Sequence, residues 1–178
     1  METGDLVLFC DGTSFVSRIV ELFTYSTYSH VALVIKDPYI VFKNCPECKD
    51  KKGIWILESG LEHPNFLGVQ LFPLEQRKGK YITRKLVPTV PLNVSKLEDL
   101  YKKVIHKKYD FIDLIRCELG IPIGFQKRTS AFFCSSLIAY VYTCLGFLNP
   151  NVDWELYQPK SFSSKYLNEL WNGSGKLT

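Results

Sequence analysis

A histidine and a cysteine whose chemistry is complementary lie far apart in this chain. His30 begins the apolar stretch His30–Ile35, and Cys134 lies in the first turn of an apolar stretch that ends at Leu145. Thiolate is the reactive form of cysteine, and the unpaired N–H groups at the start of a helix stabilise its negative charge. An imidazole beside the sulfur would accept the thiol proton. These residue types predict nucleophilic attack by sulfur, provided that the fold brings them together.

The elements that must position these two residues follow from the side chains around them. The stretch His30–Ile35 is β-branched and apolar, which favours a strand, and Asp37-Pro38 ends it. From about Ala131 apolar residues recur at helical spacing, and Gly146 closes the helix. We therefore expect the histidine at the beginning of a strand and the cysteine at the beginning of a helix.

Glu58 is the candidate third member of the site. It ends the predicted strand Ile54–Glu58, the next strand along the chain after the one that His30 begins. If the two strands pair antiparallel in a symmetric register, His30 and Glu58 face each other with Cβ atoms about 5.5 Å apart. The carboxylate would then fix the imidazole tautomer and leave the other ring nitrogen for the thiol. This register is an assumption, and a slip of one residue would turn one side chain to the opposite face.

Each of the three residues also has an ordinary structural interpretation. Cys134 shares a helical face with Leu137 and Val141, which fits an inert buried thiol. His30 alone is typical of a structural histidine, and Glu58 alone is typical of a solvated strand end. Their combination favours a site, because topology pairs His30 with Glu58 and a helix start would activate Cys134.

The order of elements indicates an α+β fold. Strand patterns fill the first half of the chain and helical patterns the second half, which is typical of that class. Ser95 followed by Glu98 predicts a capping box at one helix start. We expect a single domain over residues 1–178. Further strands are expected at 5–10, 69–72 and 81–86, and further helices at 14–25, 95–105, 111–119 and 161–171.

Composition and charge limit the classes of binding partner that the chain is expected to have. The chain has 178 residues, of which 46% are hydrophobic, and a net charge of +4. Short basic clusters at 49–52, 77–78 and 102–103 are interpreted as solvated surface, and a weak attraction to an anionic membrane remains open. There is no basic stripe interleaved with aromatic residues, so we expect no nucleic-acid partner. The sequence does not indicate an oligomeric state.

The first residues and the length of the apolar runs are used to predict the cellular location. Met1-Glu2-Thr3-Gly4-Asp5 lacks the positive charge of a secretory signal, and the apolar runs are shorter than the roughly 18 residues that cross a bilayer. We expect a cytoplasmic location, in which the six cysteines are mostly reduced thiols.

Cys45 and Cys48 form a Cys-x-x-Cys pair in the long connection 37–53. Such a pair can hold zinc, cycle as a redox couple or lie in a plain loop. Zinc needs two more ligands, and only Cys10 and His63 are near in sequence. A zinc-stabilised interaction protein is therefore one of the alternatives, with Cys45 and Cys48 as weak metal candidates.

Five short blocks in a fixed order resemble a known family. They are Gly4–Phe9, Ser29–Val34, Leu57–Ser59, Tyr109–Phe111 and Phe133–Leu137. Together they resemble the permuted NlpC-type papain-like cysteine hydrolases, a group that includes YiiX/YaeF-like proteins and, more distantly, lecithin:retinol acyltransferase. The histidine block precedes the cysteine block, as in the permuted branch.

The resemblance implies a permuted papain-like fold, in which a small antiparallel sheet or barrel packs against helices. It implies Cys134 as nucleophile, His30 as general base and Glu58 as the residue that orients His30. The reaction would cleave an amide or ester of a lipid or peptide through a thioester, by hydrolysis or transfer, without a cofactor. The alternative is a non-catalytic module that binds lipid or peptide on the same fold.

Overall fold

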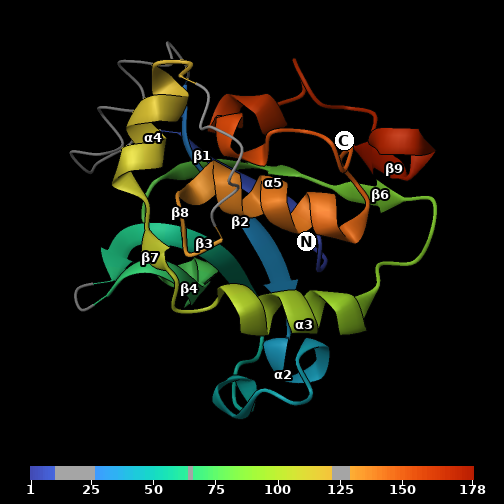
Figure 1. Ribbon diagram of the computed structural model, residues 1–178. Helices are drawn as coiled ribbons and strands as arrows, with labels where there is room; N and C mark the ends of the chain where they lie inside the picture. Colours follow the sequence, from blue (N-terminus) through green and yellow to red (C-terminus); the bar gives the residue numbers. More distant parts are fainter. Residues whose placement is uncertain (11–26, 64–65, 122–128) are drawn as a thin grey trace.

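The computed structural model describes residues 1–10, 27–63, 66–121 and 129–178 (Figure 1). Within them, seven strands form one mixed sheet in the order β5-β1-β2-β3-β4-β7-β8, and two further strands form a small second sheet. All neighbours in the large sheet are antiparallel except β7 and β8, which run parallel. The strands are β1 (Leu6–Cys10), β2 (Tyr28–Lys36), β3 (Ile54–His63), β4 (Phe66–Pro73), β5 (Lys80–Arg84), β6 (Leu86–Pro88), β7 (Lys108–Tyr109), β8 (Ala131–Phe132) and β9 (Gly175–Leu177).

The helices make the fold α+β, as the order of sequence patterns predicts. They are α2 (Pro38–Val41), α3 (Val94–Val104), α4 (Phe111–Glu118) and α5 (Cys134–Leu145). Short 3-10 segments lie at η1 (Pro46–Cys48), η2 (Leu74–Gln76), η3 (Trp154–Leu156), η4 (Pro159–Phe162) and η5 (Trp171–Gly173). Figure 1 shows α5 lying across the sheet, and α5 contacts both β2 and β3.

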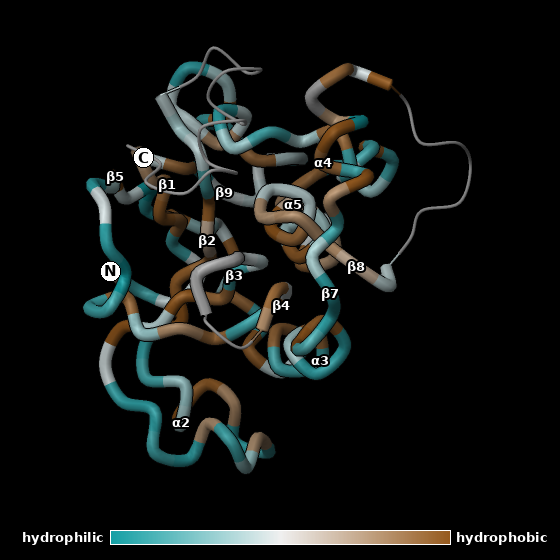
Figure 2. The backbone as a smooth tube through the Cα atoms, turned by 90° about the vertical axis from the view of Figure 1, so that its left-hand side faces the viewer, coloured by the Kyte–Doolittle hydropathy of each residue, from teal (hydrophilic) through white to brown (hydrophobic). Residues whose placement is uncertain are grey.

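Alternation along the central strands divides the apolar side chains between two cores. In β2, Val31, Leu33 and Ile35 belong to the larger core, which also contains side chains of α3 and α5. Ala32 and Val34 belong to a smaller core on the opposite face. This division is the expected result of the two-residue period of a strand that is buried on both faces. Figure 2 shows the hydrophobic stretches of the strands and of α5 in the interior.

Helix α5 is tied to the residues before β1 and ends at a glycine. The Tyr142 hydroxyl of α5 donates a hydrogen bond of 2.7 Å to the Gly4 carbonyl oxygen before β1. The helix ends at Gly146, whose φ of 89° is a left-handed conformation that favours glycine. Because these contacts hold α5 against the sheet, its first residue has a defined position relative to β2 and β3.

Several expectations from the sequence need correction. Helix α3 begins after Asn93, whose side chain accepts the Lys96 N–H, and Glu98 accepts the Asn44 N–H, so the capping box is wrong. The helix expected at 161–171 is also wrong, because this segment is largely irregular between η4 and η5. The helix expected at 14–25 lies outside the described residues.

The Cys-x-x-Cys pair is a disulfide. The 3-10 turn η1 brings the Cα atoms of Cys45 and Cys48 to 5.3 Å, a separation that a disulfide spans. The expectation that the cysteines are mostly reduced is therefore wrong for these two. As a disulfide the pair supplies no thiolate to a metal, which removes the zinc interpretation for this state.

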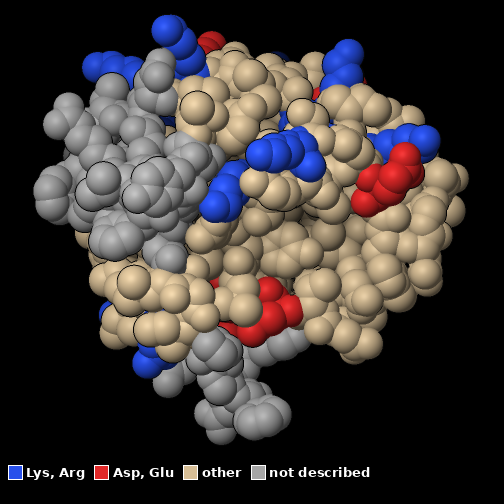
Figure 3. Space-filling view, turned by 90° about the horizontal axis from the view of Figure 1, so that it is seen from above, with Lys and Arg blue, Asp and Glu red and all other residues tan. Residues whose placement is uncertain are grey.

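On the face seen in Figure 3, charged side chains are scattered among uncharged residues. Among the described helices, each is too short or too polar to cross a bilayer.

Arg84 at the end of β5 fastens the C-terminal segment to the sheet. Its guanidinium donates to the carbonyl oxygens of Phe162, Leu167 and Leu177 and to the Asn168 side chain. Arg84 is buried, with 3% of its surface exposed. Removing the guanidinium would leave these buried oxygen acceptors without a hydrogen-bond donor, which destabilises the fold.

We expect Arg84→Met to lower the free energy of unfolding by about 3 kcal/mol, measured by urea denaturation. The matched control is Lys85→Met, because Lys85 is exposed and adjacent. That variant is expected to stay within about 0.5 kcal/mol of wild type. Equal stability of both variants would contradict the role given to Arg84.

Candidate active site

His30 and Glu58 are in direct contact in the interior. His30 Nε2 lies 2.6 Å from Glu58 Oε2, and the two residues are 7% and 0% exposed. A contact this short between an imidazole and a buried carboxylate is a charge-assisted hydrogen bond. It occupies Nε2 and leaves Nδ1 as the second ring nitrogen.

The register that brings them together differs from the predicted one by two residues. Strands β2 and β3 pair Leu33 with Leu57 and Lys36 with Ile54, which places Ala32 and not His30 opposite Glu58. His30 is therefore a diagonal neighbour of Glu58. The predicted contact survives the wrong register, because a shift of two residues keeps both side chains on the same face.

Cys134 is the first residue of α5 and is 2% exposed. The predicted helix start at Ala131 is three residues too early, because Ala131 and Phe132 form β8. The hydroxyl of Ser136 accepts the Phe133 N–H and donates to the Phe133 carbonyl oxygen, which stabilises the first turn. The Ser59 hydroxyl donates to the Phe132 carbonyl oxygen and so ties β3 to the residues just before Cys134.

The structure also brings Cys134 to His30. Burial is the largest influence on the pKa of His30 and would lower it, but a hydrogen bond and charge attraction to Cys134, together with the contact to Glu58, raise the pKa to about 9. The imidazolium form is therefore favoured at neutral pH. Burial alone would raise the pKa of Glu58, yet His30, Arg77 and Gln70 lower it, so Glu58 stays ionised.

Two further residues around Glu58 were missed by the sequence analysis. The Gln70 amide on β4 donates to Glu58 Oε1 at 3.1 Å, and Arg77 Nε lies 3.4 Å from Glu58 Oε2. Arg77 belongs to a cluster interpreted as solvated surface, and this is wrong, because its side chain is only 9% exposed. The register of β4 against β3 places Gln70 opposite Glu58. The position of Gln70 in the sequence does not by itself indicate a contact with Glu58.

Residues of the blocks Gly4–Phe9 and Tyr109–Phe111, which contribute to the family resemblance, stabilise the backbone around the site. The Asp5 carboxylate accepts the N–H groups of Glu2 and Leu86, which holds the start of β1. Asp110 caps α4 by accepting the Asp113 N–H, and Tyr109 packs beside Phe133, the neighbour of Cys134. These residues position backbone near the site.

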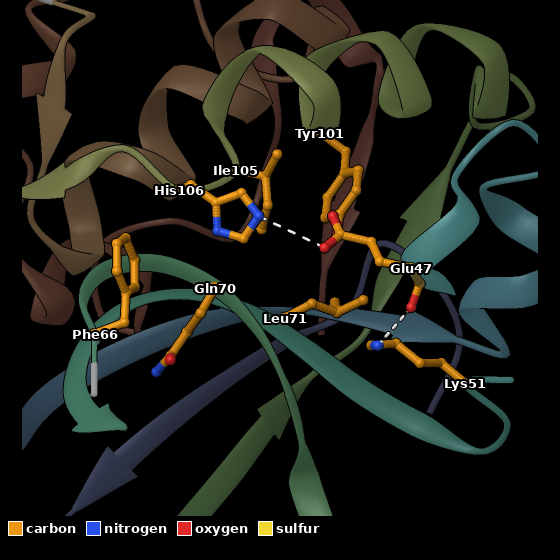
Figure 4. Close-up of a pocket in the computed structure, with 8 residues that line it drawn as sticks. All are labelled: Glu47, Lys51, Phe66, Gln70, Leu71, Tyr101, Ile105 and His106. Carbon is orange, nitrogen blue, oxygen red and sulfur yellow. Dashed lines mark hydrogen bonds and ion pairs between the residues drawn. The ribbon is translucent and has the colours of Figure 1, made fainter. Parts of the chain in front are cut away.

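A separate cavity of about 210 Å³ is lined by Gln70 and Leu71 of β4, by Tyr101 of α3 and by Glu47. Figure 4 shows Glu47 between His106 and Lys51, with its carboxylate 3.5 Å from His106 and accepting a hydrogen bond from Tyr101. The Lys51 ammonium donates to the Glu47 carbonyl oxygen. Because neither His30 nor Cys134 lines this cavity, it is a separate feature from the candidate site.

Comparisons with known proteins place the fold. No protein family and no curated protein sequence matches the chain. Among solved structures, the chain is similar to metalloprotein yiiX from Escherichia coli O157:H7, with a TM-score of 0.53 and 25% identity. The similarity covers 81% of this chain and 66% of that protein, so the chain spans less than two thirds of its length. The fold is thus yiiX-like.

In the part of the chain that the structure describes, no group of three or more His, Cys, Asp or Glu side chains is arranged to hold an ion. The expected pair Cys45 and Cys48 is closed as a disulfide.

The environment of His30 predicts an unusual titration. We expect the His30 ring to change charge near pH 9 in an NMR titration, and both Cys134→Ala and Glu58→Gln to lower that pKa. The sign follows because each variant removes an interaction that favours the imidazolium while burial continues to oppose it. The three histidine signals are assigned with His30→Gln. An unchanged pKa in both variants would contradict the contacts described above.

Proposed function

We propose that this chain is a thiol hydrolase or acyltransferase that cleaves an amide or ester through a thioester on Cys134. The observation that carries the proposal is the buried contact of His30 with Glu58, 2.6 Å long, on a ring that also interacts with a cysteine at a helix start. A nucleophile beside a base, with the base held by a third group, is the arrangement that covalent catalysis requires. The block resemblance to permuted NlpC-type papain-like hydrolases points to the same chemistry.

In the proposed reaction His30 holds the proton of Cys134 before substrate binds. The thiolate attacks the carbonyl carbon, a carbon–sulfur bond forms, and the carbonyl oxygen takes the negative charge. The Cys134 N–H has no partner within the helix and is available to that oxygen. His30 then gives its proton to the leaving amine or alkoxide as the bond to carbon breaks.

The second half of the reaction uses the now neutral His30 as a base. It takes a proton from water or from an acceptor alcohol or amine, which attacks the thioester and releases the Cys134 thiolate. Glu58 keeps the ring in one orientation and balances its charge in both halves. The substrate class proposed is a lipid or peptide that contains an amide or ester.

The name metalloprotein belongs to the yiiX neighbour. In the proposed reaction the side chains of Cys134, His30 and Glu58 carry out the chemistry.

A small electrophile tests the nucleophile directly. Iodoacetamide and acyl-type activity probes are expected to modify Cys134 faster than any other cysteine, with the adduct located by mass spectrometry. Cys144 is the matched comparison, because it lies on the same helix and is more exposed. Cys134→Ala should abolish the adduct, and Cys144→Ala should leave it intact. Equal, slow labelling of Cys134 and Cys144 would contradict the proposal and favour a non-catalytic module.

The pKa of His30 sets the alkaline limit of turnover. Above about pH 9 the ring loses the proton that the leaving group needs, so the turnover of an activated ester or amide is expected to fall there. An amide should show the fall more strongly than a phenyl ester, because an amine leaves only after protonation. A rate that keeps rising well beyond that pH for the amide would exclude His30 as the acid.

A further inference from the structure

Arg77 lies against the carboxylate that holds His30. It follows the short segment η2 and is placed by its own N–H, which donates to the Leu74 carbonyl oxygen at 3.0 Å. Its Nε lies 3.4 Å from Glu58 Oε2, the same oxygen that contacts His30 Nε2. One carboxylate oxygen therefore lies between an imidazole and a guanidinium.

The guanidinium also packs on an aromatic ring that adjoins the site. The Arg77 Cζ atom lies 4.9 Å from the centroid of the Phe9 ring, within the range of a cation–π interaction. The Phe9 ring centroid is 5.6 Å from that of His30, and the two residues are register partners on β1 and β2. Phe9 thereby restrains Arg77 on one side and the His30 ring on the other.

In the active form that the proposed mechanism requires, the charges of these four side chains alternate. Cys134 as thiolate, His30 as imidazolium, Glu58 as carboxylate and Arg77 as guanidinium form a row whose net charge is zero. Without Arg77, the active form of the other three would bury a net negative charge, which is unfavourable in an apolar interior. Nothing in the comparisons or in the proposed mechanism assigns a role to Arg77.

We propose that Arg77 is a positioning residue of the site, which holds Glu58 ionised and in place so that Glu58 can hold His30. This inference rests on the proposed function. Arg77 touches neither the sulfur nor the reacting carbon in the proposed mechanism, and it acts through Glu58. The titratable groups that face Glu58 are His30 from β2 and Arg77 after η2, while β4 contributes the neutral amide of Gln70.

The test is the pH profile of Cys134 alkylation by iodoacetamide in the full chain, followed by mass spectrometry. Loss of the guanidinium makes Glu58 easier to protonate, and a protonated Glu58 no longer stabilises the imidazolium partner of the thiolate. Arg77→Met is therefore expected to move the acid limb of the profile upward by about one pH unit. Arg77→Lys, which restores a cation, should return the limb toward its wild-type position.

A destabilised variant separates this effect from a general loss of structure. Arg84→Met removes another buried arginine that has no contact with the three site residues, so it should lower stability and leave the acid limb in place. An acid limb that is the same in wild type and Arg77→Met would overturn the role of Arg77. A limb that moves equally in Arg84→Met would overturn it as well.

A second comparison keeps the proposal testable if Arg77→Met fails to fold. In a Glu58→Gln background the carboxylate is absent, so adding Arg77→Met should leave the profile unchanged. A difference between Glu58→Gln and the double variant would show that Arg77 acts independently of Glu58. If the proposed function itself is wrong, a different result is expected: wild-type Cys134 would react with iodoacetamide no faster than Cys144.

Discussion

The ionised carboxylate of Glu58, buried at the centre of the sheet, is the constraint on which the candidate site depends. A buried charge is tolerated only where opposite charge and hydrogen bonds surround it. Glu58 has no exposed surface, and it finds His30, Gln70 and Arg77 around its two oxygens. These partners come from β2, β4 and the turn after η2, so the strand order of the sheet is what assembles the site.

The helix that carries the cysteine is joined to this arrangement by backbone contacts. The Ser59 hydroxyl follows Glu58 directly and binds the Phe132 carbonyl oxygen, two residues before Cys134. The same short stretch of β3 thus holds both the carboxylate and the approach to the helix start. Because α5 is also fixed by Tyr142 to the start of β1, a shift of the helix along the sheet would break contacts at both ends.

The architecture is similar to that of yiiX, and the candidate site is formed by a few side chains within it. The connection 37–53 carries its own short helices and the Cys45–Cys48 disulfide, and it packs on α3 through Tyr101, whose ring stacks on Phe42. Arg84 secures the opposite end of the chain. Both features lie away from His30 and Cys134, so they support the frame without adding groups to the candidate site.

The α+β class, most strand positions and the face shared by His30 and Glu58 can be predicted from the amino-acid pattern. These features depend on local periodicity, which a strand or helix expresses through its own side chains. The contact of His30 with Glu58 was predictable for the same reason, since a shift of two residues preserves the face.

The register of β2 against β3, the Cys45–Cys48 disulfide and the burial of Arg77 follow from the folded arrangement. Each depends on residues that are distant in the chain or on a turn whose geometry no short pattern specifies. Arg77 is the clearest case, because an arginine beside a lysine is typical of solvated surface until Glu58 and Phe9 are placed around it. The approach of Cys134 to His30 is likewise a property of how α5 docks on the sheet, since packing between elements fixes that distance.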